Sequence, residues 1–88
     1  MVFEGEYLNG KRNGKIKEYY KNGKLAFEGE YLKGKRNGKG KEYFDDGELE
    51  FEGEYLNGER WNGKGKEYHF GIFKFDIKYL KGKKDWFF

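Results

Sequence analysis

The motif FEGEYL at residues 27–32 recurs along the chain at a fixed spacing. Copies begin at Phe3 and Phe51, 24 residues before and after it, and a degenerate fourth copy begins at Phe75. A fixed period of this length indicates a repeat architecture. We therefore expect a single domain over residues 1–88, with repeats at about 3–26, 27–50 and 51–74 and a degenerate copy at 75–88 that caps the array.

Each motif has the alternation of a half-buried β-strand, with Phe27 and Tyr31 on one face and the two glutamates on the other. Turn-rich stretches such as residues 9–14 follow the motifs, and Asn22-Gly23 and Asp46-Gly47 favour tight hairpin turns. The sequence thus predicts an all-β fold: a single-layer antiparallel array of β-hairpins, a meander of about eight strands. These strands are expected near residues 2–8, 15–20, 25–32, 39–44, 49–56, 64–70, 72–80 and 85–88.

Glycines in the middle of the predicted strands need an explanation, because glycine weakens a strand. They are Gly5, Gly29 and Gly53. We expect an aromatic ring from an adjacent strand to lie across each bare backbone. The alternative is a groove in which the backbone of a ligand approaches closely.

The composition supports a folded, soluble chain. Charged residues make up 40% of it, but 22% is aromatic, and aromatic rings bury large apolar areas. Cysteine is absent, so no disulfide or thiolate metal site is available. The first residues carry Glu4 and Glu6 where a signal peptide needs a basic start and an apolar run, and no stretch has membrane-spanning length. We expect a cytoplasmic location.

The repeated residues resemble a known family. The sequence EGEY at 4–7, 28–31 and 52–55, followed by turn residues such as NGKRNGK at 9–15, closely resembles the MORN repeat, in particular its variant form in bacteria and protists. The resemblance implies stacked β-hairpins and a role in protein contact, scaffolding or binding of acidic phospholipid, without catalytic residues. The sequence departs from the pattern at Trp61, at Ile77 and in the tail 85–88.

An enzymatic function is not expected. The chain has no Ser, Thr or Cys, so alcohol and thiol nucleophiles are missing, and His69 is a single imidazole that we expect at the surface or in a turn. The paired glutamates recur in every copy, whereas a glycosidase needs one asymmetric pair. We expect them to face lysines across the strands. No cofactor and no metal site are predicted.

A basic turn edge is the first candidate binding surface. Eleven cations are predicted along one long side of the sheet, opposed only by Glu59 and Asp85: Lys11, Arg12, Lys15, Lys35, Arg36, Lys39, Arg60, Lys64, Lys81, Lys83 and Lys84. Such an edge could meet an acidic protein, an acidic phospholipid surface or RNA. The alternative is an edge that only solvates the fold.

Aromatic side chains are the second candidate surface. A ladder of Tyr7, Tyr31, Tyr55 and Tyr79 is expected on one face, either packed or available to a ligand. Trp61 beside Arg60 has the composition of a binding hot spot, although it could equally form a turn bulge that packs on its own hairpin.

The two ends of an open sheet also need partners. Trp86, Phe87 and Phe88 are expected to close the C-terminal end or to insert into a partner. The first strand has no visible cap, so a homodimer or capture of a partner strand is plausible there. The predicted partner-binding residues are Arg60, Trp61, Tyr7, Tyr31, Tyr55, Arg12, Arg36, Trp86 and Phe88.

The leading functional hypothesis is a non-enzymatic protein-binding or scaffolding module that uses an aromatic sheet face and a basic turn edge. One alternative is a small inhibitor of a bacterial enzyme or defence complex, of the antitoxin or anti-CRISPR type. Another is peripheral binding to acidic phospholipid. Fold alone does not separate these hypotheses.

Overall fold

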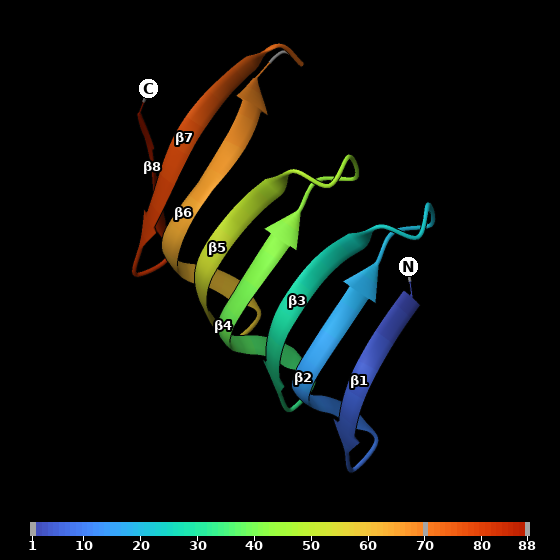
Figure 1. The fold of residues 1–88 in the computed structure, drawn as a ribbon. Helices are drawn as coiled ribbons and strands as arrows, with labels where there is room; N and C mark the ends of the chain where they lie inside the picture. Colours follow the sequence, from blue (N-terminus) through green and yellow to red (C-terminus); the bar gives the residue numbers. More distant parts are fainter. Residues whose placement is uncertain (1, 70, 88) are drawn as a thin grey trace.

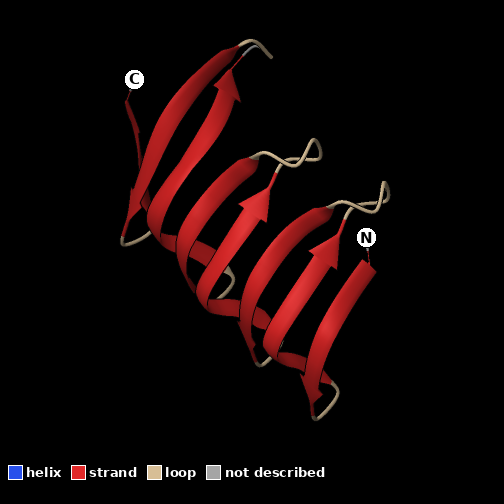
Figure 2. Ribbon diagram, viewed as in Figure 1, coloured by secondary structure: helices blue, strands red, loops and turns tan. Residues whose placement is uncertain are grey.

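A computed structural model describes residues 2–69 and 71–87, with the side chains of Trp86 and Phe87 outside the description. Within these residues the chain forms one antiparallel sheet whose strands follow each other in sequence order, without a helix (Figure 2). The strands are β1 Val2–Leu8, β2 Lys11–Tyr19, β3 Leu25–Leu32, β4 Lys35–Tyr43, β5 Leu49–Leu56, β6 Glu59–His69, β7 Phe73–Leu80 and β8 Lys83–Phe87. The predicted eight-stranded meander is confirmed.

Tight turns lie along one long edge of the sheet, and longer loops lie along the opposite edge (Figure 1). Each tight turn has two residues with positive φ, as a two-residue hairpin turn requires: Asn9–Gly10, Lys33–Gly34, Asn57–Gly58 and Lys81–Gly82. The predicted turn stretches were therefore too long. Strands β2, β4 and β6 begin at residues 11, 35 and 59 instead of 15, 39 and 64.

In β2 and β4 the second Asn-Gly pair of the turn-rich stretch lies in a bulge inside the strand, whereas the bulge of β6 lies at Trp61. Gly14 and Gly38 both have a φ of 92°, and the pairing register shifts between Gly29 and Tyr31 in the partner strand β3. A bulge bends its strand and increases the local twist. The bulges are consistent with the pronounced curvature of the strands along their length (Figure 1).

The core lies on one face of this curved sheet, which we call the inner face. Phe27 and Phe51 are fully buried there, and Tyr55 is 3% exposed between them. Its ring meets both phenylalanines edge-on, with centroid distances of 5.4 Å. Glu28, Glu52 and Glu54, which are next to these residues in sequence, fall on the other side, the outer face. Curvature thus gives a single-layer sheet a packed aromatic core.

The mid-strand glycines allow close packing on the inner face. A Cβ at Gly40 would lie 2.8 Å from the ring of Phe27, and one at Gly29 would lie 2.7 Å from the same ring. Phe27 is in an adjacent strand to Gly40 but in the same strand as Gly29. At Gly5 the nearest groups are the Lys15 carbonyl and the Ile16 side chain, and at Gly53 they are the backbone of Asn62 and Gly63. The prediction of an adjacent aromatic ring over Gly5, Gly29 and Gly53 was therefore wrong, because backbone and aliphatic groups approach there as well.

Candidate functional site

An arginine, a tyrosine and a glutamate meet on the inner face where one repeat contacts the next. Arg36 Nε and Nη2 donate to Glu18 Oε2 at 3.2 and 3.1 Å, and the Tyr31 hydroxyl donates to the same oxygen at 2.7 Å. The guanidinium carbon also lies 4.1 Å from the ring centroid of Phe27. Glu18 is only 3% exposed. We call this arrangement a junction, because Glu18 comes from one repeat and its donors from the next.

The same junction recurs 24 residues later. Arg60 Nε and Nη2 donate to the two oxygens of Glu42 at 3.0 and 3.1 Å, and the Tyr55 hydroxyl donates to Glu42 at 2.7 Å. Arg60 Nη2 also reaches Glu50 at 3.1 Å. A planar guanidinium that binds a carboxylate through two nitrogens fixes geometry better than a lysine does. The junctions therefore set how successive repeats stack.

The titration behaviour of this second junction follows from its burial and its hydrogen bonds. Burial alone would raise the pKa of Glu42, but the hydrogen bonds from Arg60 and Tyr55 outweigh it and hold that pKa below its usual value. Burial, reinforced by the Glu42 charge, raises the pKa of Tyr55 well above that of a free tyrosine. Glu42 thus stays ionised and Tyr55 stays neutral.

The junctions correct the predicted location of the arginines. Arg12, Arg36 and Arg60 lie within strands and stack on Phe3, Phe27 and Phe51 of the inner face, so they are not part of the turn edge. The sequence suggested an edge because the strands were expected to begin four or five residues later. Among the predicted tyrosines, Tyr55 is packed and Tyr31 is partly buried, whereas Tyr7 is 57% exposed.

A second contact links three of the tight turns, at residues 33–34, 57–58 and 81–82, to the preceding repeat. The main-chain N–H of Lys33 donates to Asn13 Oδ1 at 3.0 Å, and that of Gly34 donates to the Arg12 carbonyl at 2.9 Å. The turns at Asn57–Gly58 and Lys81–Gly82 are held in the same way, by Asn37 and Arg36 and by Asn62 and Trp61. We call this contact the turn clamp.

Trp61 takes part in the last of these clamps. Its carbonyl accepts the Gly82 N–H at 2.8 Å, and its ring lies 3.2 Å from the position of a Cβ at Gly82. Trp61 is half-buried and lies in β6. Trp61 is the extra residue of a bulge in β6, because Arg60 pairs with Tyr55 and Asn62 pairs with Glu54. Its ring packs on the turn of the following hairpin, β7–β8.

The turn edge carries an exposed row of leucines that the sequence analysis did not single out. Leu8, Leu32, Leu56 and Leu80 each precede a tight turn and are 59%, 50%, 41% and 61% exposed. Three of them pair across the turn with a lysine, namely Lys11, Lys35 and Lys83, while Leu56 pairs with Glu59. A leucine at the same place in every copy was the available signal.

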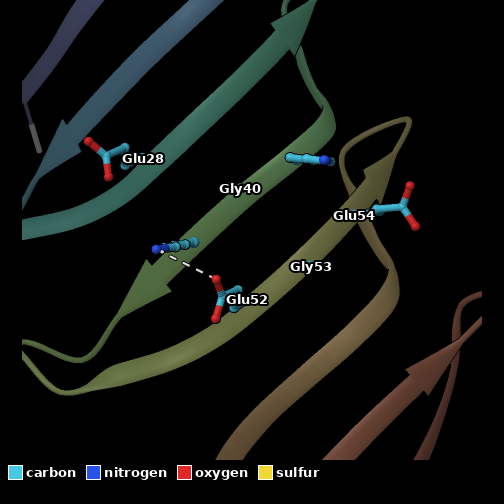
Figure 3. A pocket seen from close by; sticks show the side chains of 7 residues that line it. Glu28, Gly40, Glu52, Gly53 and Glu54 are labelled. Carbon is cyan, nitrogen blue, oxygen red and sulfur yellow. Dashed lines mark ion pairs between the residues drawn. The ribbon is translucent and has the colours of Figure 1, made fainter.

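The outer face carries the glutamates and lysines in alternation, as predicted. Lys17 lies 3.8 Å from Glu28, and Lys41 lies 3.5 Å from Glu52. Shallow hollows open between these side chains over bare glycine backbone, and one is lined by Glu28, Lys39, Gly40, Lys41, Glu52, Gly53 and Glu54 (Figure 3). Ion pairs of this exposure are common on solvated sheets.

The remaining predicted residues lie toward the C-terminal end. His69 ends β6, within 3.0 Å of Glu67 and with its ring centroid 4.6 Å from that of Phe75. The side chains of Trp86 and Phe87, and Phe88 as a whole, lie outside the described residues, so their predicted roles stay predictions. The described residues hold no group of three or more carboxylate, imidazole or thiolate side chains placed to bind a metal. Nor do they include a helix long and apolar enough to cross a membrane.

Equal hairpins joined edge to edge, with junctions and turn clamps that recur every 24 residues, define a β-hairpin repeat protein. The chain belongs to the MORN repeat family: the family model of the MORN repeat matches residues 3–25 and 27–48. MORN repeats are generally associated with binding of proteins or membrane lipids and with scaffolding. No curated protein and no solved structure shows significant similarity to the chain.

Proposed function

We propose that the chain is a non-enzymatic protein-binding module that holds an acidic partner along its turn edge. The observation that carries this proposal is the leucine row beside the turn lysines. Leu8, Leu32 and Leu80 are each at least half exposed, although the inner face has apolar side chains fully buried. Exposed apolar groups that recur along one edge are typical of interaction surfaces.

The charges of the edge favour an acidic partner. The turns and the residues that follow them carry Lys11, Lys33, Lys35, Lys81 and Lys83, with Glu59 as the opposing charge. Successive leucines are spaced about 10 Å apart, because each repeat adds two strands of about 4.8 Å. A partner with acidic groups around apolar anchors at that spacing would complement the edge.

A pull-down from the source cell, with bound proteins quantified by mass spectrometry, tests this proposal. Leu32→Ser with Lys35→Glu should lose the proteins that the parent chain recovers. A variant with Lys21→Glu carries the same charge change on the loop edge and should keep them. If the turn-edge variant recovers the same proteins in the same amounts, the turn edge is not the binding surface.

Binding to acidic phospholipid is the second candidate, and the same observation favours it. Leucines beside lysines are the residues that insert into and contact an anionic bilayer surface. Flotation with vesicles of phosphatidylcholine alone and with added phosphatidylserine separates the two proposals. Salt-sensitive flotation with the anionic vesicles only, lost in the turn-edge variant, supports lipid binding. Equal behaviour with both vesicles contradicts it. The inhibitor and RNA hypotheses stay predictions.

A further inference from the structure

Each of the two interior junctions has an acceptor half from the earlier repeat and a donor half from the later repeat. The earlier repeat supplies the acceptors: a glutamate on the inner face, and an asparagine side chain and a main-chain carbonyl beside the next turn. The later repeat supplies the donors: a tyrosine and an arginine that bind the glutamate, and the two N–H groups of its turn. Glu18 and Asn13 accept hydrogen bonds from the second repeat in this way, and Glu42 and Asn37 accept them from the third.

The first repeat has the donor half of a junction, but the matching acceptor half is absent from the described residues. Arg12 stacks on Phe3 at 3.4 Å, as Arg36 stacks on Phe27, but Arg12 Nε is buried without a hydrogen-bond partner in the described part of the chain. A buried donor without an acceptor is costly. Tyr7, which matches the bonded Tyr31 and Tyr55, is 57% exposed.

The first turn is also open. Asn9 and Gly10 have φ values of 51° and 78°, close to those of the clamped turns. Within residues 2–69 and 71–87, however, their N–H groups have no counterpart of the turn clamp. A Cβ at Gly10 would meet nothing within 4 Å, whereas one at Gly82 would meet the Trp61 ring.

We propose that the edge of β1 is a docking site for an antiparallel β-strand of a partner protein, whose glutamate binds Arg12 and Tyr7. The free edge of β1 supplies the main-chain hydrogen bonds, and the inner face supplies the recognition. This surface is separate from the leucine row, so the proposal stands or falls independently of the proposed function.

The interior pairings specify the glutamate and the asparagine of the partner strand. Glu18 pairs with Phe27 and Glu42 with Phe51, which places the partner glutamate opposite Phe3. The clamping asparagine precedes the glutamate by five residues in Asn13 to Glu18, in Asn37 to Glu42 and in Asn62 to Glu67. The partner strand should repeat that spacing, because one strand makes both contacts.

The outer face adds a charge requirement. Lys15 and Lys17 pair with Glu30 and Glu28, so lysines at the same places in a partner strand would face Glu6 and Glu4 of β1. Opposite charges across strands support pairing. The docked strand therefore has the pattern N-x-K-x-K-E, with its asparagine near the first turn.

A second copy of this chain fits the edge less well. Two β1 strands paired with each other would bring only glutamates together on the outer face, because β1 contains no lysine. Strand β8, with the sequence KKDWF, contains no glutamate to bind Arg12. The charges of the edge thus favour a strand from another protein.

Fluorescence anisotropy with a labelled peptide tests the proposal on the whole 88-residue chain. The probe is KRNGKIKEYY, the sequence of residues 11–20, which carries the required pattern. A second peptide has glutamine in place of its glutamate. We expect saturable binding of the first peptide and about tenfold weaker binding of the second, because a charge-assisted hydrogen bond is lost. Equal affinity of both peptides overturns the proposal.

Two further measurements locate the peptide. Hydrogen exchange should slow at the Asn9 and Gly10 amides, and slowing in β8 instead contradicts the site. In the protein, Arg12→Gln should weaken binding about as much as the glutamine peptide does, whereas Lys21→Gln, an equal charge change on a distant loop, should not. Sedimentation of the chain alone tests the other occupant: a dimer that Arg12→Gln dissociates assigns the edge to a second copy and overturns the partner-strand proposal.

Discussion

The interior junctions and the last junction use the same positions with different chemistry. In the interior, Arg36 binds Glu18 and Arg60 binds Glu42 through two guanidinium nitrogens each. In the last junction Lys84 binds Glu67 through one ammonium group at 3.0 Å. The Glu18 side chain is 4% exposed, but that of Glu67 is 30% exposed.

This difference shows where the array holds its shape. A planar guanidinium with two bonds to a buried carboxylate defines one orientation, while an exposed ammonium is a mobile point charge. Core packing follows the same gradient: Phe27 and Phe51 are fully buried, and Phe75 is only half-buried. We infer that the middle of the array is its stable centre and that the β7–β8 hairpin opens more easily.

Removing a core ring should have the largest effect on stability, and it tests whether the middle of the array is more stable than its end. Phe51→Ala should destabilise the chain by about 3–5 kcal/mol, a large part of the stability of so small a domain, because it removes the ring that supports Tyr55 and Arg60. Phe75→Ala, at the matching position of the last repeat, should cost less. Urea unfolding followed by circular dichroism measures both. Equal losses would mean that the repeats contribute equally.

Neutralising an interior carboxylate should have the next largest effect. Glu42→Gln removes the ion pair of Arg60 with Glu42 in a mostly buried site and leaves Arg60 only its contact with Glu50, and we expect a loss of about 2 kcal/mol in the free energy of unfolding. The control is Glu28→Gln on the outer face, whose pair with Lys17 is about half exposed and should contribute less than about 0.5 kcal/mol. A similar loss in both variants would contradict the special role of the junction.

The same carboxylate makes stability depend on acid. The pKa of Glu42 is lower in the folded chain than the ordinary value of 4.5, so the unfolded chain binds the proton more tightly. The stability that ionised Glu42 contributes is complete at pH values above 4.5 and is lost as the pH falls through the pKa of the folded state. Urea unfolding at several pH values below 5 should therefore show a smaller acid-dependent loss for Glu42→Gln than for the parent chain. Parallel curves for the two proteins would contradict this assignment.

The turn clamp should contribute less than the junction. Asn13→Ala removes the acceptor of the Lys33 N–H, and we expect a loss of about 1 kcal/mol. Asn13→Asp keeps an oxygen at the same place and should retain most of the stability. Thermal unfolding of the two variants measures the difference. If both variants unfold like the parent chain, the clamp contributes nothing to stacking.

The sequence was sufficient to predict the strands, because the alternation of FEGEYL and its period are local signals. It was not sufficient to distinguish a turn from a bulge. Asn9-Gly10 forms a turn and Asn13-Gly14 a bulged strand, although the two dipeptides are identical. Which of them closes the hairpin depends on the pairing of whole strands, and a short-range pattern does not contain that information.

The site was harder to predict for a related reason. Arg36 and Glu18 are 18 residues apart, and only the register of β2, β3 and β4 brings them together. The arginines therefore looked like free cations of an edge. The leucine row, in contrast, was visible in the sequence as Leu8, Leu32, Leu56 and Leu80, but alternation alone does not say which apolar residues stay exposed.

Replacing Lys84, the cation of the last junction, should have the smallest effect on stability, and it tests whether this lysine makes the last junction weaker than the interior ones. Lys84→Arg places a guanidinium at the position that Arg36 and Arg60 occupy in the interior, beside Glu67. We expect a gain of about 0.5 kcal/mol, since a second charge-assisted bond becomes available in a partly exposed site. Hydrogen exchange of the β8 amides is the sensitive measurement, and it should slow in Lys84→Arg and quicken in Lys84→Ala. If Lys84→Arg exchanges as fast as the parent chain, the loose end of the array is set by its less buried core and not by its cation.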